Sequence, residues 1–202
     1  MLYGISYRKL HPDISVDHYL TLLFGSRADF IQWREKDLPV REQREWVEKC
    51  VSLARRGRKI FLVNSHTELA LSTGADGVHL TSKQSTPECL DMRRRAGRET
   101  DFMIGKSVHT VRAAVAAESE GVDYLLLGPV FDPISKESDR MPLGLQALRE
   151  ASYMLYTPVF ALGGISLQSV EIVRATTAVG VAGISWLSRE ISAAVDHPAE
   201  DA

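Results

Sequence analysis

Short β-rich apolar segments alternate with amphipathic segments from one end of the chain to the other. The amphipathic segments, such as residues 41–57, 110–121 and 143–155, place apolar side chains at helical spacing. Several of the apolar segments are hydrophobic on consecutive residues, which is typical of strands in a parallel sheet that is covered on both faces. The strands that this pattern predicts cover residues 2–6, 28–34, 59–64, 77–80, 102–108, 123–130, 158–164 and 179–185.

Eight strand–helix units in one chain of 202 residues predict an α/β protein with a single compact (β/α)8 TIM barrel. We place the barrel at residues 1–195 and a polar C-terminal tail at residues 196–202. A typical barrel of this kind has roughly 250 residues, so this one is small. The alternative is an open doubly wound sheet, which usually carries a glycine-rich turn after its first strand. The segment GISYRKLHPD after the first strand is not such a turn, so we favour the barrel.

The charge balance gives no sign of a nucleic acid or a membrane as a partner. Lys and Arg total 24 against 26 Asp and Glu, for a net charge of −2. No apolar run approaches the roughly 20 residues of a membrane helix, and the start MLYGISYRK is too short and too polar for a signal peptide. Cys50 and Cys89 share no metal-ligand spacing and fall in predicted helices, so we expect reduced packing residues. These features predict a cytoplasmic protein.

Gln32, Arg34 and Lys36 lie at alternate positions at the end of the second predicted strand. Active sites of barrels lie where the strands end and the following loops begin. Alternate residues of an extended segment share one face, and an arginine beside a lysine suits a doubly charged anion or a pyrophosphate. The alternative is a solvated strand end whose cations form a surface ion pair with Glu35.

Glycines and a hydroxyl end the last two predicted strands, at Gly163-Gly164 and at Ile184-Ser185. Barrels often bind phosphate at the loops after these two strands, where backbone N–H groups point inward and glycine lets the ligand approach. The alternative role of the glycines is tight turn geometry.

Lysine and histidine side chains supply further candidates. The long loop after the sixth strand contains Ser135 and Lys136, and it is either a mobile lid whose lysine reaches an anion or an ordinary exposed loop. His66 and His109 follow strand ends and are candidate acid or base groups, whereas His79 lies within an apolar strand and is expected to be an interior histidine. No His/Cys/Asp metal cluster, nucleophile elbow or phosphate-binding P-loop occurs in the sequence.

Seven segments follow one another in a fixed order along nearly the whole chain: QWREK, VNSHTELALSTGADGVHL, IGKSVHT, GVDYLLLGPVFDPISK, PLGLQAL, PVFALGGI and GVAGIS. Together they resemble the thiamin phosphate synthase/TenI family. The synthases of this family join a pyrimidine diphosphate to a thiazole phosphate and release pyrophosphate with the help of magnesium. The resemblance implies that Gln32 meets the pyrimidine. It places the pyrophosphate contacts at Arg34, Lys36, Asn64, Ser107 and Lys136, and the thiazole phosphate contacts at Ser135, Gly163, Gly164, Ile184 and Ser185.

The chain departs from the family pattern at the two magnesium carboxylates. Ser65 stands where the pattern has Asp after Asn, and Gln84 stands where the pattern has a second Asp. Since Mg²⁺ prefers carboxylates plus substrate phosphates, the resemblance implies that the ion reaches this site only through substrate phosphates, with weakened metal-dependent activity. The loop after the sixth strand also has Pro133 in place of a Thr, and the catalytic histidine of the TenI-type tautomerases is replaced by Pro129.

Three activities stay open from the sequence. The first is a thiamin phosphate synthase-like transferase with catalytic roles for Arg34 and Lys136. The second is a metal-free thiazole tautomerase whose base is His66 or His109. The third is a non-catalytic binder of thiazole phosphate or thiamin phosphate. A homo-oligomer is a further expectation, because Trp46, Trp186 and Tyr153 are candidates for a contact face, although packing roles are favoured.

Overall fold

Eight parallel strands close into a barrel, as the alternating sequence pattern predicts. The structure, a computed structural model, describes residues 1–132 and 141–197. Each strand pairs with the next along the chain, and β8 pairs back to β1 with Leu2 opposite Val181, so the sheet has no open edge. This closure excludes the open doubly wound sheet. The strands are β1 (Leu2–Ile5), β2 (Phe30–Trp33), β3 (Ile60–Asn64), β4 (Gly77–Leu80), β5 (Met103–Val108), β6 (Tyr124–Leu127), β7 (Val159–Leu162) and β8 (Gly180–Gly183).

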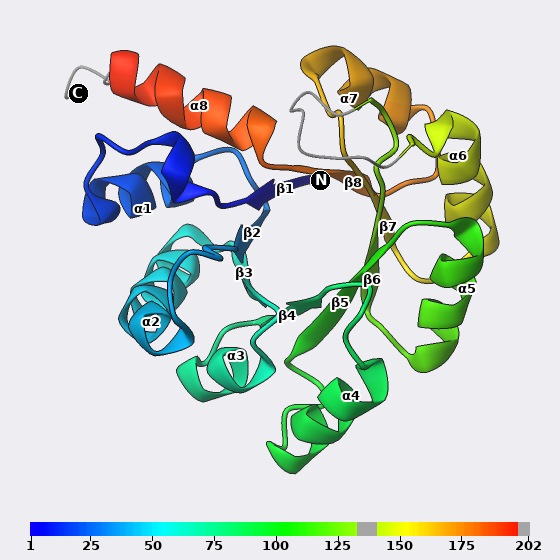
Figure 1. The fold of residues 1–202 in the computed structure, drawn as a ribbon, viewed down its shortest axis with the longest axis horizontal. Helices are drawn as coiled ribbons and strands as arrows, with labels where there is room; N and C mark the ends of the chain where they lie inside the picture. The colour runs from blue at the N-terminus through cyan, green and yellow to red at the C-terminus, as the bar shows by residue number, and fades with distance from the viewer. Residues whose placement is uncertain (133–140, 198–202) are drawn as a thin grey trace.

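Helices follow the strands and form an outer ring around the barrel (Figure 1). Helix α2 illustrates why they form, because Val47, Cys50, Val51 and Ala54 recur at helical spacing and are all buried. Its end is set by Arg58, which takes a left-handed conformation with φ of 52°. The helices are η1 (Arg8–Leu10), α1 (Val16–Gly25), α2 (Val40–Gly57), α3 (Thr67–Thr73), α4 (Thr86–Arg95), α5 (Val111–Glu120), α6 (Gly144–Met154), α7 (Leu167–Arg174) and α8 (Ser185–Asp196).

Two apolar layers hold the fold together. The outer layer lies between the strands and the helices and contains most of the buried aliphatic residues, such as Leu23, Val63 and Leu148. The inner layer fills the barrel and is dominated by aromatic rings, with Tyr3 stacked on Phe30 at 5.6 Å between ring centroids. Since full burial of one such side chain contributes about 1.5–3 kcal/mol, the inner rings are a large part of the stability of the barrel.

Gly105 on β5 makes room for the ring of Tyr124 inside the barrel. In the strand register Gly105 lies between His79 on β4 and Tyr124 on β6. A Cβ atom at this position would lie 1.9 Å from a ring carbon of Tyr124, so any side chain here would collide with the ring. The absent side chain therefore lets Tyr124 extend across β5 toward His79, at the level where polar groups enter the barrel.

Each strand predicted from the sequence is present, although several end earlier than predicted. The seventh strand stops at Leu162 because Gly163 and Gly164 take φ values of 88° and 65°, which a β-ladder does not accommodate. Cys50 and Cys89 are buried, free thiols in α2 and α4, as expected. None of the helices within residues 1–132 and 141–197 combines the length and the apolar character that crossing a membrane requires.

The three residues considered for a self-association face differ in exposure. Trp46 and Trp186 are partly buried and pack against the outer apolar layer, in agreement with a packing role. Tyr153 is 84% exposed at the end of α6, and Tyr156, just beyond the helix, is 99% exposed. Self-association remains a prediction, with Tyr153 as its only exposed candidate among these three.

Candidate functional site

A chain of hydrogen bonds begins at the C-terminal end of β3 and runs into the barrel. The Ser65 hydroxyl donates to Asn64 Oδ1 at 3.0 Å, and Asn64 Nδ2 donates to Gln32 Oε1 at 3.1 Å. Gln32 Nε2 in turn donates to the hydroxyl of Tyr3 at 2.8 Å. Gln32 and Tyr3 are almost completely buried, so these bonds satisfy polar groups that would otherwise be costly inside the barrel.

The chain continues across the barrel to β5. The Tyr3 and Tyr124 hydroxyls lie 2.9 Å apart, and the Tyr124 hydroxyl lies 3.1 Å from His79 Nδ1. His79 Nε2 then lies 2.8 Å from the hydroxyl of Ser107. Burial lowers the pKa of His79 from 6.5 to about 3, so the imidazole is neutral and has one donor and one acceptor nitrogen for its two partners. His79 is thus the satisfied interior histidine that the sequence predicts.

This polar network, defined as Ser65, Asn64, Gln32, Tyr3, Tyr124, His79 and Ser107, gathers three sequence-predicted site residues: Gln32, Asn64 and Ser107. Sequence reasoning missed Tyr3 and Tyr124, which bridge the two halves of the network. The available signal was a tyrosine inside each of two otherwise apolar strands, because a buried tyrosine hydroxyl requires a partner.

Two cationic side chains, Arg34 and Lys36, lie on the β2–α2 loop, just after the strand that contains Gln32. The Arg34 backbone N–H donates to the Ser6 hydroxyl at 2.9 Å, which anchors the loop to the end of β1. Lys36 is exposed, and its pKa is lowered chiefly by the positive charge of Arg34. Two cations close enough to disfavour each other's charge form a site that an anion would stabilise.

Glu35 does not pair with these cations at the surface, and this alternative from the sequence is wrong. Glu35 is 1% exposed and accepts hydrogen bonds from the Ser6 hydroxyl at 2.7 Å and from the Arg8 backbone N–H at 3.0 Å. Burial raises its pKa in spite of these bonds. The carboxyl group therefore links the loops after β1 and β2, and in the described part of the chain it does not form an ion pair with Arg34 or Lys36.

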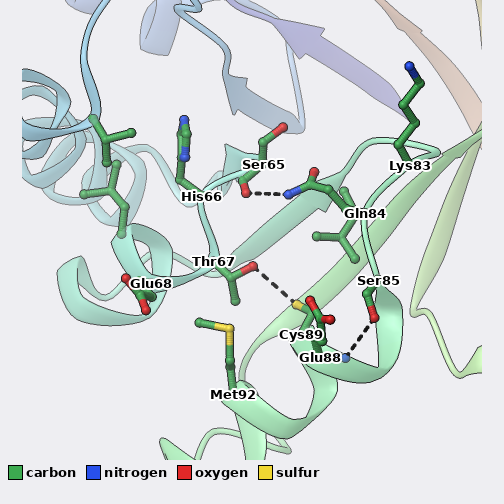
Figure 2. A pocket seen from close by; sticks show the side chains of 13 residues that line it. Ser65, His66, Thr67, Glu68, Lys83, Gln84, Ser85, Glu88, Cys89 and Met92 are labelled. Atoms are coloured by element: carbon green, nitrogen blue, oxygen red, sulfur yellow. Dashed lines mark hydrogen bonds between the residues drawn. The ribbon is translucent and has the colours of Figure 1, made fainter.

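Ser65 and Gln84, the two positions that lack the family carboxylates, are in direct contact. Gln84 Nε2 donates to the Ser65 backbone oxygen at 2.8 Å (Figure 2). Gln84 Oε1 accepts from the Thr81 backbone N–H at 2.9 Å. Ser65 has a φ of 66°, in the left-handed region that Asn and Asp adopt more readily than other non-glycine residues. These two residues line the rim of a hollow of about 640 Å³ between α3 and α4.

The oxygens of this rim are engaged in hydrogen bonds within the protein. Asn64 Oδ1 accepts from Ser65, and Gln84 Oε1 accepts from Thr81. Within residues 1–132 and 141–197, no group of three or more His, Cys, Asp or Glu side chains is placed to hold a metal ion. Ser65 and Gln84 therefore offer a metal neutral oxygens in place of two carboxylates, which does not fit a magnesium site built by the protein.

Gly163 and Gly164 fulfil the tight-turn requirement. Both have positive φ, and a Cβ atom on Gly163 would lie 2.6 Å from Pro129 Cβ.

On the neighbouring strand, Ile184 precedes α8, which begins at Ser185, and among the described residues no side chain caps this helix. By contrast, α7 carries its own capping box. The backbone N–H groups at the start of α8 can therefore donate hydrogen bonds to an anion beside the turn after β7.

The remaining candidates lie apart from the network. His109 follows β5, and its Nδ1 lies 2.5 Å from the backbone oxygen of Gly128, at the end of β6. His66 is the N-terminal residue before α3 and lines the hollow between α3 and α4, where burial lowers its pKa. Ser135, Lys136 and Pro133 lie outside the described residues.

Comparison with known proteins identifies the family of the chain. The family model described as thiamine monophosphate synthase matches residues 2–187. The thiamine-phosphate synthase of Chlorobium phaeovibrioides is 37% identical over 162 residues, which are 80% of this chain and 76% of that protein. The corresponding protein of Halalkalibacterium halodurans is 33% identical over 184 residues, covering 91% of this chain and 85% of its own.

A solved structure is similar to this chain in both fold and sequence. The thiamine phosphate pyrophosphorylase of Pyrococcus furiosus superposes with a TM-score of 0.78 at 30% identity, over 98% of this chain and 96% of that one. The match covers the barrel from end to end, including the strand ends that carry the polar network and the two adjacent cations. With its closed barrel and this sequence similarity, the chain belongs to the thiamine monophosphate synthase family.

Proposed function

We propose that this protein binds a pyrimidine diphosphate and a thiazole phosphate and joins them to thiamin phosphate, with release of pyrophosphate. The observation that supports this best is the polar network, because it holds Gln32, Asn64 and Ser107 at the same end of the barrel as Arg34 and Lys36. A buried amide suits a heteroaromatic ring with donor and acceptor atoms, and the adjacent cations suit its diphosphate. Both features are needed for the pyrimidine substrate.

In this reaction the bond between the pyrimidine methylene carbon and the diphosphate oxygen breaks, and both electrons leave with pyrophosphate. A lone pair on the thiazole nitrogen forms the new carbon–nitrogen bond. Arg34 and Lys36 would stabilise the charge that develops on the leaving group. Because the positive charge of Arg34 lowers the pKa of Lys36, an arriving anion also favours the charged lysine.

The thiazole phosphate would lie at the turn after β7 and the start of α8. The uncapped N–H groups at Ser185 and the close backbone approach at Gly163 and Gly164 support this placement. Ser135 and Lys136 remain predicted contacts from the sequence. The two substrates would then approach each other across the polar network, with Gln32 beneath the pyrimidine.

Magnesium, which the synthases of this family generally use, would reach the site only with the substrate phosphates. The neutral, hydrogen-bonded oxygens of Asn64 and Gln84 support this view. When bound, the ion would neutralise part of the diphosphate charge. We therefore expect a reaction that is slower than in relatives with both carboxylates and that responds weakly to added metal.

Purified protein supplied with both substrates provides the test, with thiamin phosphate and pyrophosphate measured in Mg²⁺ and in EDTA. Ser65→Asp/Gln84→Asp is the companion variant, because Asp is compatible with the left-handed φ at position 65. We expect slow turnover by the wild type and a larger response to Mg²⁺ in the double variant. A wild type that binds both substrates and forms no product would contradict the proposal and indicate a binding role.

A thiazole tautomerase is the second candidate, and the position of His109 favours it. The catalytic histidine of such enzymes is replaced here by Pro129, but His109 Nδ1 contacts the oxygen of Gly128, the residue before it. With Nδ1 donating to this oxygen, Nε2 is left with the lone pair of a base. Isomerisation of the thiazole carboxylate phosphate without pyrimidine, lost in His109→Ala, would support this function. Loss in His66→Ala instead would assign the base to the outer hollow.

A further inference from the structure

We propose that Lys83 contacts the diphosphate of the pyrimidine substrate and neutralises part of its negative charge. In the family, a metal ion held by the protein has this role. The chain would then bind pyrophosphate and stabilise its release without a divalent cation. This inference rests on the proposed function, and it concerns the same leaving group. It follows from the disagreement between the family requirement for magnesium and the neutral side chains at positions 65 and 84.

The β4–α4 loop fixes the backbone of Lys83 at the C-terminal end of the barrel. The Gln84 backbone N–H donates to the Thr81 oxygen at 3.1 Å, which closes a tight turn with Ser82 and Lys83 at its centre. Gln84 then ties this turn to the β3–α3 loop by its 2.8 Å bond to the Ser65 oxygen. Lys83 is therefore held beside Ser65, and its side chain is exposed to an incoming ligand.

Charged side chains of both loops line the hollow between α3 and α4. Within it, Figure 2 shows the side chains of Lys83, Ser65 and His66 directed to one side and those of Glu68 and Glu88 to the other. Within the described parts of the chain Lys83 forms no ion pair, although Glu68 and Glu88 line the same hollow. Burial lowers the pKa of His66, which leaves Lys83 as the cation of this rim at neutral pH.

Cations thus flank the end of β3 on both sides. The strand order places β3 between β2 and β4, with Leu62 opposite both Gln32 and Gly77. Arg34 and Lys36 follow β2, and Lys83 follows β4. A diphosphate bound over Asn64 and Ser65 would meet positive charge from both neighbouring loops. Carboxylates at positions 65 and 84 would oppose such binding unless a metal ion neutralised them, whereas Ser and Gln do not.

The binding of inorganic pyrophosphate, measured by calorimetry in EDTA at low salt, tests this inference without relying on turnover. We compare the wild type with Lys83→Gln and with Lys49→Gln, which removes the same charge from α2, where Lys49 pairs with Asp17 and Glu45. A charge-assisted contact of typical strength predicts about tenfold or greater weakening in Lys83→Gln, against less than about twofold in Lys49→Gln. Thiazole phosphate binding should be unchanged in both variants, which shows that the fold is intact.

Ser65→Asp/Gln84→Asp gives the converse test. We expect the double variant to bind pyrophosphate weakly in EDTA and to recover binding in Mg²⁺. The inference is overturned if the wild type binds pyrophosphate only in Mg²⁺, or if Lys83→Gln binds as tightly as the wild type in EDTA. Absence of thiamin phosphate formation would overturn the proposed function alone, because pyrophosphate binding reports on Lys83 independently of product.

Discussion

Acidification tests the buried position of His79 at the centre of the polar network. The imidazole is 2% exposed, and burial lowers its pKa from 6.5 to about 3. The unfolded chain therefore binds a proton at a pH where the folded protein does not. Stability from this group is fully present above pH 6.5 and is lost as the pH falls toward 3.

The magnitude follows from the same two pKa values. One proton taken up only by the unfolded state costs the folded state about 1.4 kcal/mol per pH unit, so the loss between pH 7 and pH 5 is about 2 kcal/mol. For a chain of this length the melting temperature should fall by roughly 4–8 °C over that range because of His79 alone. Urea unfolding at several pH values, followed by circular dichroism, measures the free energy directly.

His79→Gln is the matched variant, because an amide can still bond to Tyr124 and Ser107 but does not titrate. Burial also lowers the pKa values of His11 and His66, so some loss on acidification should remain in the variant. The difference between the two curves isolates the contribution of His79. Parallel curves for wild type and variant between pH 7 and pH 5 would refute a buried, neutral histidine at this position.

Substitutions at three further positions test the packing and hydrogen bonds around the site, each by urea unfolding at pH 7. Gly105→Ala should destabilise the fold by about 1–3 kcal/mol or more, since its Cβ would lie 1.9 Å from the ring of Tyr124; an unchanged midpoint would show that the ring can move away. Tyr124→Phe should cost about 1–3 kcal/mol, because Tyr3 and His79 lose their shared partner, and a cost near zero would mean that water replaces the hydroxyl. Glu35→Ala should cost about 1–3 kcal/mol and Glu35→Gln clearly less, as the amide oxygen can still accept a hydrogen bond; equal costs would argue against that acceptor role.

The barrel was predictable because its signal is repeated. Each strand–helix unit is short, and consecutive apolar residues in the strands indicate a parallel sheet covered on both faces. Strand ends were less predictable, since they depend on individual backbone conformations. Gly163 and Gly164 read as part of an apolar strand, yet their positive φ values end it at Leu162.

The candidate site was predictable at the strand ends and not in the interior. The sequence places Gln32, Asn64 and Ser107 at the right level, because residues at the C-terminal ends of parallel strands meet at one end of the barrel. It does not show that Tyr3 and Tyr124 connect them. That connection requires closure of β8 onto β1 and the missing side chain at Gly105, which are properties of the assembled barrel.

The role of Glu35 shows why charge in a sequence is a poor guide to charge in a site. Read along the chain, Glu35 stands between Arg34 and Lys36 and would neutralise one of them. In the fold its carboxyl group turns away, is buried, and accepts hydrogen bonds from Ser6 and Arg8. At the other loop, the side chains of Glu68 and Glu88 point away from Lys83 in Figure 2, although all three residues line one hollow. Because an anion site depends on the balance of charge around it, the directions of these three carboxyl groups matter as much as the positions of the lysines and arginine.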